Sequence, residues 1–113
     1  MLHDLRSMKK DIEADLFVVP ESDGGRRTPF SSGYRPQFSF DGRDNDVVIT
    51  ILDRDQLSGG ETGAVALSFR VPELQAGRFS IGDDFCIAEG ARVVCRGTIT
   101  KIIDDTMAVG DPD

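Results

Sequence analysis

Apolar and polar residues alternate along several short stretches of the chain. The clearest stretch begins at Asp11 and ends before Pro20, and every second residue from Ile12 to Val18 is apolar. Side chains on a β-strand point alternately to its two faces, so this period of two predicts a strand with one buried face. Phe17 adds an apolar residue to the other face, which predicts partial burial there as well.

Similar short runs follow at Arg35 to Asp41, Val47 to Leu52, Gly63 to Val71, Arg78 to Ile81, Phe85 to Ala88, and Val93 to Ile103. Six or seven short strands with a turn signal about every ten residues predict an all-β barrel or sandwich. No segment predicts a long helix. Between the first two strands, glycine, proline and short polar residues from Glu21 to Gly33 predict a long loop.

The last two predicted strands form a hairpin whose register can be proposed from the sequence. Residues 89–92 place Gly90 at the first of two central turn positions, where a positive φ is needed. If pairing continues without interruption, Cys86 faces Cys95 with Cα atoms about 4.5 Å apart. That distance permits a disulfide. We expect two neighbouring, reduced thiols instead, because the cytosol opposes disulfide formation.

Composition limits the classes of function. The chain has 113 residues, a mass of 12.3 kDa and a net charge of −7, which predicts one domain that repels polyphosphate overall. Apolar runs never exceed four residues, so we expect a soluble, cytoplasmic protein without a membrane helix or a secretory signal. The single histidine, His3, lies in a polar N-terminal stretch. Histidine-dependent catalysis and a zinc site are therefore not expected.

Motifs for nucleotide and metal binding are weak or missing. The chain has no phosphate-binding loop, so we expect no GTP binding, and the glycines from Gly59 to Gly63 are predicted to form a turn. Residues 53–55 and the acidic stretch Asp41 to Asp46 contain closely spaced carboxylates, but both lack the pattern of a calcium loop. We expect solvated acidic loops, no metal and no cofactor.

One segment departs from the acidic character of the chain. From Gly24 to Arg43, four arginines accompany a single aspartate, and aromatic residues lie between them. Arginines beside a glycine-rich turn and aromatic rings suit contacts with phosphate and sugar. The alternative is that the rings belong to the core and that the arginines are exposed loop residues.

This segment also carries a family resemblance. Residues 24–30 (GGRRTPF) and 33–38 (GYRPQF) closely resemble the start of the C-terminal β-barrel domain of bacterial elongation factor Tu. Residues 85–92 and 97–103 resemble its last hairpin and closing strand. The resemblance implies a six-stranded antiparallel β-barrel, which we place at residues 11–104, between an N-terminal tail (1–10) and a C-terminal tail (105–113).

In that family the domain helps to bind the T stem of aminoacyl-tRNA and packs on companion domains. The resemblance places RNA contacts at Arg26, Gln37, Glu89 and Gly90, with Arg27 where the family usually has histidine. Nothing in the sequence resembles the GTPase domain, and no acid–base pair is identifiable. The implied function is therefore a non-enzymatic binding module.

Two departures from the family pattern affect the expected partner. The acidic stretch Asp41 to Asp46 replaces a threonine-rich loop, and Gln75 stands in place of a lysine. Both changes weaken the attraction to phosphate. The negative charge thus favours a protein partner, or a second copy of the chain in a homodimer. Binding of tRNA or another structured RNA through the five residues above is the alternative.

Overall fold

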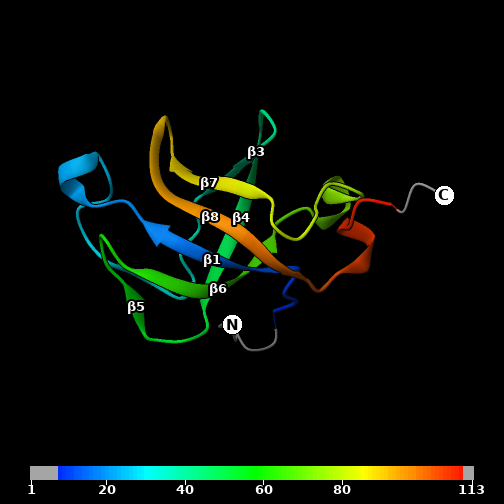
Figure 1. Ribbon diagram of the computed structural model, residues 1–113, viewed down its shortest axis with the longest axis horizontal. Coiled ribbons are helices and arrows are strands. Elements are labelled where there is room, and N and C mark those ends of the chain that lie inside the picture. The colour runs from blue at the N-terminus through cyan, green and yellow to red at the C-terminus, as the bar shows by residue number, and fades with distance from the viewer. Residues whose placement is uncertain (1–7, 111–113) are drawn as a thin grey trace, which may run out of the picture.

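The computed structural model describes residues 8–110, in which six antiparallel strands close into a barrel (Figure 1). The order around the barrel is β1-β6-β4-β3-β7-β8. The strands are β1 (Ile12–Val18), β3 (Gln37–Phe40), β4 (Arg43–Ile51), β6 (Thr62–Phe69), β7 (Asp84–Glu89) and β8 (Arg92–Ile102). The predicted all-β, six-stranded antiparallel barrel is confirmed. The structure does not describe residues 1–7 and 111–113. His3 and most of the predicted N-terminal tail therefore lie outside the described residues.

The core fills the barrel with the inward-facing residues that the alternation predicted. In β1, Ile12, Leu16 and Val18 are at most 2% exposed. Aromatic rings fill the centre. The ring centroid of Phe38 lies 4.6 Å from that of Phe85 and 5.0 Å from that of Phe69. Large rings at these separations bury much apolar area, which is the main driving force for closing the barrel.

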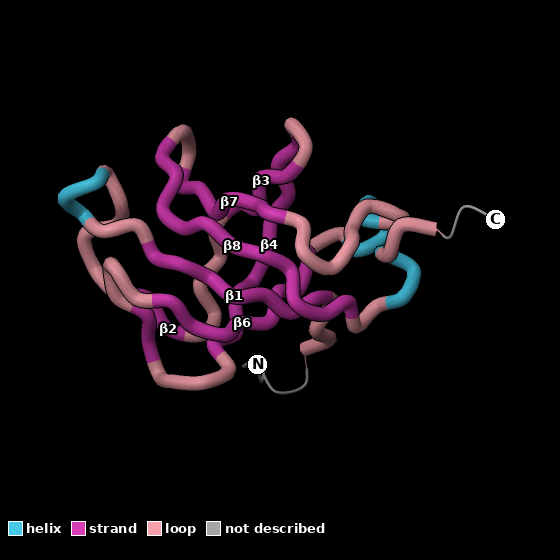
Figure 2. Tube along the Cα trace, viewed as in Figure 1, coloured by secondary structure: helices cyan, strands magenta, loops and turns pink. Residues whose placement is uncertain are grey.

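Smaller elements lie outside the barrel sheet (Figure 2). Two-residue strands β2 (Phe30–Ser31) and β5 (Gln56–Leu57) pair with each other, and three 3-10 turns are present: η2 (Glu21–Asp23), η3 (Pro72–Gln75) and η4 (Asp105–Met107). The predicted long loop from Glu21 to Gly33 therefore contains η2 and β2. Within residues 8–110, no helix is long and apolar enough to cross a membrane.

Two of the sequence predictions about local structure are wrong. Arg78 to Ile81 is not a strand, because only Phe79 forms a β-bridge, with Ala108, and the Arg78 side chain turns toward the interior instead. The stretch 41–46 is not a loop. Asp41 and Gly42 have φ values of 53° and 75°, which make a two-residue hairpin turn, and β4 begins directly after them.

The cysteine register is also corrected. The hairpin turn pairs Glu89 with Arg92 as predicted, but a β-bulge follows, so that Cys95 lies opposite Ile87 and Cys86 opposite Arg96. One extra residue in β8 shifts every pair beyond it by one position. The two cysteines are free and not cross-strand partners. Cys95 is fully buried, and this burial raises the pKa of its thiol to about 12.

Candidate functional site

The double glycine of the sequence motif sets the path of the chain into the site. Gly24 closes η2 with a φ of 92°, a conformation that side chains with a Cβ rarely adopt. A Cβ on Gly25 would lie 1.8 Å from the carbonyl oxygen of Val19. Only glycine fits against this backbone, and Arg26 follows it directly in the chain.

Arg26, Glu89 and Tyr34 form a hydrogen-bonded cluster at the β7–β8 hairpin. The Arg26 Nη1 donates to Glu89 Oε2 at 2.6 Å, and its Nε donates to the carbonyl of Thr28 at 3.0 Å. The Tyr34 hydroxyl donates to the same Glu89 oxygen. The Arg26 guanidinium also lies over the Tyr34 ring, 4.8 Å from its centroid. Arg26 is thus a partly buried, anchored side chain and not the exposed loop arginine that the sequence suggested.

The charges of this cluster are matched internally. The Tyr34 hydroxyl and then the Arg26 guanidinium hold the pKa of Glu89 below its ordinary value, while partial burial opposes them. Burial, together with the neighbouring Glu89 carboxylate, raises the pKa of Tyr34. At neutral pH the cluster is therefore an Arg26–Glu89 ion pair with a neutral tyrosine attached. The raised pKa keeps the Tyr34 hydroxyl protonated, so it acts as a hydrogen-bond donor to Glu89.

The other residues named by the resemblance lie close to this cluster. Gln37 pairs with Ala88, the residue before Glu89, and Gly90 forms the tip of the hairpin with a φ of 59°. Arg27 follows Arg26 and is exposed. The structure therefore brings together residues as far apart in the sequence as Arg26 and Gly90. Tyr34 is the member of the cluster that the resemblance did not name. The sequence showed it only as an aromatic residue between arginines, without a role.

The chain matches the family model described as the elongation factor Tu C-terminal domain, over residues 6–103. The chain belongs to this family. Domains of this family are non-catalytic barrels that act in translation, so the elongation factor Tu-like barrel is a translation-related binding module.

Both departures from the elongation factor Tu pattern have structural counterparts. Gln75, where the resemblance implied a lysine, is fully buried in η3, where its side-chain oxygen accepts a hydrogen bond of 2.5 Å from Arg78. It supports the fold and offers no charge to a ligand. The acidic stretch forms the β3–β4 turn and the first part of β4, where Asp44 and Asp46 are exposed. These carboxylates oppose the approach of a phosphate backbone.

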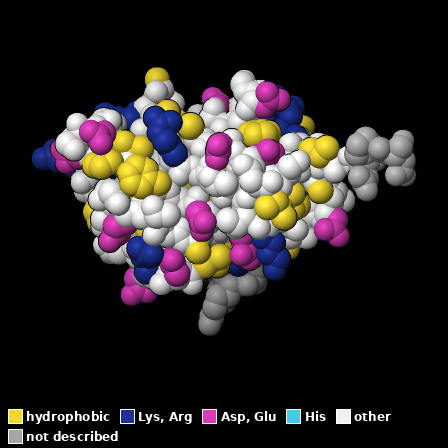
Figure 3. Space-filling view, in the orientation of Figure 1, with side chains coloured by type: hydrophobic (Ala, Val, Ile, Leu, Met, Phe, Trp, Pro, Cys, Tyr) yellow, Lys and Arg dark blue, Asp and Glu magenta, His cyan; other side chains and the backbone are white. Residues whose placement is uncertain are grey.

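A groove of about 610 Å³ runs across the outside of β1, β8, β7 and β3, and we call it the wall groove. One row of outward-facing positions crosses it, because Phe17 pairs with Arg96, Arg96 with Cys86, and Cys86 with Ser39. Phe17 is 38% exposed. Figure 3 shows an apolar patch over this part of the barrel, between acidic side chains. The wall groove thus has an apolar end and polar borders.

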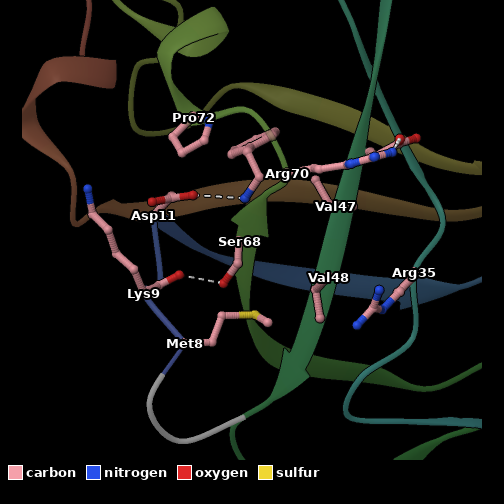
Figure 4. Close-up of a pocket in the computed structure, with 11 residues that line it drawn as sticks. Met8, Lys9, Asp11, Arg35, Val47, Val48, Ser68, Arg70 and Pro72 are labelled. Atoms are coloured by element: carbon pink, nitrogen blue, oxygen red, sulfur yellow. Dashed lines mark hydrogen bonds and ion pairs between the residues drawn. The ribbon is translucent and has the colours of Figure 1, made fainter. Parts of the chain in front are cut away.

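A second groove, of about 710 Å³, lies on the outside of β4 and β6 (Figure 4). At its edge Asp11 is 1% exposed, and its Oδ2 accepts a hydrogen bond of 2.8 Å from the Phe69 amide, while its Oδ1 has no hydrogen-bond partner. Burial raises the pKa of Asp11. Its carbonyl oxygen accepts bonds from the amides of Ile103 and Asp104, so Asp11 ties the start of β1 to β6 and to the end of β8.

Proposed function

We propose that this elongation factor Tu-like barrel is a non-enzymatic, cytoplasmic module that binds a protein partner, either another translation component or a second copy of itself. The family membership supports a role in translation. The choice of a protein over RNA rests on the charges of the site and on the wall groove.

The Arg26–Glu89 pair carries this proposal. Arg26 is the arginine that RNA binding would use first, and its guanidinium already donates to Glu89 and to the Thr28 carbonyl. A phosphate would have to compete with a carboxylate that lies at 2.6 Å. With the acidic β3–β4 hairpin and a net charge of −7, the long-range attraction to RNA is also lost.

The wall groove supports the choice of a protein partner. Phe17 is a large aromatic side chain with more than a third of its surface exposed, and Arg96 lies beside it on β8. Aromatic residues and arginine are enriched in the centres of protein interfaces. A symmetric homodimer is one way to cover the groove, because a single self-complementary patch is sufficient.

Binding of tRNA or another structured RNA is the second candidate function. Its support is the convergence of Arg26, Arg27, Gln37, Glu89 and Gly90 at one end of the barrel, the positions that the family resemblance names. Arg27 is exposed and can reach a phosphate without breaking the Arg26–Glu89 pair.

Two measurements separate the candidates. In a salt series with fluorescently labelled tRNA, we expect no saturable binding at 150 mM salt; binding that weakens on Arg27→Ala and has a steep salt slope would instead support the RNA function. In sedimentation equilibrium at micromolar concentration, we expect self-association that Phe17→Ser removes. A strict monomer that also binds no apolar dye would exclude the homodimer and restrict the proposal to a different protein.

A further inference from the structure

A third groove, separate from the wall groove, lies between the start of β4 and η3. Its volume is about 300 Å³, and we call it the η3 groove; its lining residues are Asp44, Asn45, Asp46, Arg70, Val71 and Leu74. Figure 2 shows η3 at the end of the barrel that also carries η4 and the C-terminal segment. None of these lining residues belongs to the wall groove.

One side of the η3 groove is apolar and exposed. Val71 is 43% exposed and Leu74 is 58% exposed. The Leu74 amide donates to the Val71 carbonyl at 3.2 Å, which closes the first turn of η3, and both residues line the groove. Two large aliphatic side chains on one turn of a surface element form a small contact surface that an apolar partner can cover.

The other side is acidic. Asp44 and Asp46 are two positions apart in β4, so both point outward from the barrel. Asp46 lies 3.4 Å from Arg70, but both side chains are more than half exposed, so this ion pair is weak. Within residues 8–110, the side chain of Asp44 has no hydrogen-bond or ion-pair partner.

Arg78 holds the two sides at a fixed separation. Its guanidinium donates to Asn45 Oδ1 at 2.7 Å, to Gln75 Oε1 at 2.5 Å and to the carbonyl of Phe40 at 2.8 Å. These bonds join η3 to the β3–β4 hairpin. Arg78 donates only to neutral oxygens and forms no ion pair with Asp44 or Asp46, and the groove is formed before any partner binds.

From this arrangement we infer that the η3 groove binds a basic amphipathic segment of a partner protein. Apolar side chains of that segment pack on Val71 and Leu74, and its Lys or Arg side chains pair with Asp44 and Asp46. The net charge of −7 steers a basic segment toward the protein. The inference rests on the proposed protein-binding function but uses a surface of its own, and a groove of this size fits a transient interaction.

The test uses a labelled 18-residue peptide of leucine and lysine with one apolar helical face. Its controls are a scrambled peptide of the same composition and a leucine–glutamate peptide. In a ¹⁵N NMR titration we expect the largest shifts at Val71, Leu74 and Asp44. The scrambled peptide should bind more weakly, and the acidic peptide should not bind.

Matched variants decide whether the groove is responsible. Leu74→Ser should weaken peptide binding about ten-fold, in line with loss of one buried leucine contact. Leu52→Ser, at a similarly exposed leucine (46%) elsewhere on the surface, should leave it unchanged. Asp44→Asn should weaken binding and flatten its salt dependence, whereas Asp55→Asn should do neither. All four positions are exposed, so folding is retained.

Equal effects of Leu74→Ser and Leu52→Ser, or shifts centred on another surface, would overturn the inference.

The variant Phe17→Ser distinguishes the η3 groove inference from the proposed function. Unchanged peptide binding in Phe17→Ser is expected, because Phe17 lies in the wall groove. Saturable tRNA binding at 150 mM salt would contradict the proposed protein-binding function, and the peptide titration would still report on the η3 groove alone.

Discussion

The guanidinium of Arg26 and the carboxylate of Glu89, 63 positions apart in the sequence, meet at 2.6 Å. One comes from the loop before β2 and the other from the end of β7, so the ion pair joins the glycine-rich motif to the last hairpin. In this family member, the two charges are paired with each other at the surface where the resemblance places RNA contacts. Their coupling can be measured.

We predict that Arg26→Ala and Glu89→Gln are non-additive. Each single substitution removes the same ion pair, so the double variant should be less destabilised than the sum of the two by about 1 kcal/mol. Urea denaturation at pH 7 of the four proteins measures this coupling. Because the pKa of Glu89 is depressed in the folded state, its contribution is present above its ordinary pKa of 4.5 and is lost as the pH falls through the folded-state value. Strict additivity would show that the pair does not stabilise the protein.

Asp11 should make stability depend on pH in the opposite direction. Burial raises its pKa above 3.8, so the folded protein holds this proton more tightly than the unfolded chain. Its contribution to stability is complete below pH 3.8 and is lost as the pH rises through the folded-state pKa.

Asp11→Asn should therefore raise the unfolding free energy at pH 7 and remove this pH dependence. The asparagine oxygen can still accept the Phe69 amide. Lys9 and Asp104, the charged groups that act on Asp11, remain in place. Thermal denaturation from pH 3 to pH 8 makes the comparison, with the exposed Asp15→Asn as control. A loss of stability at pH 7 in Asp11→Asn would show that the buried carboxylate is needed.

The β-bulge predicts unequal thiol reactivity. Cys86 lies half-buried in the wall groove, while Cys95 is buried with a pKa of about 12. A thiol reagent should therefore modify one cysteine of the folded protein quickly and the second only after unfolding. Cys86→Ser should abolish the fast reaction. Mild oxidation should form no disulfide within the folded monomer, and a Cys86–Cys95 disulfide seen by mass spectrometry would mean that the bulge is absent.

Gly25→Ala should destabilise the protein by more than about 2 kcal/mol. The new Cβ would lie 1.8 Å from the Val19 carbonyl oxygen, and that oxygen belongs to the backbone and cannot rotate away. Chemical denaturation gives the size of the effect. Gly110→Ala is the control, because an added Cβ meets no atom within 4 Å there. Similar stability of the two variants would show that the chain at Gly25 can move.

Much of the barrel was predictable because the signal is local. Alternating apolar residues identified β1 and the inward face of β6, and the Gly90 turn was predicted correctly down to the Glu89–Arg92 pair. The prediction failed where long-range contacts dominate: Arg78 to Ile81 has the composition of a strand, but Arg78 is bonded to Asn45 and to the Phe40 carbonyl on the β3–β4 hairpin.

The sequence by itself determined the all-β fold, because side-chain periodicity and turn glycines act over a few neighbouring positions, and its motif residues determined the family. Only the tertiary structure decided that Arg26 is paired with Glu89, that Cys86 and Cys95 are separated, and that Val71 and Leu74 face Asp44 and Asp46 across a groove. Each of these depends on strand register or on contacts between segments far apart in the chain. One residue inserted by a bulge reverses which face a side chain occupies, and no local pattern in the sequence records it.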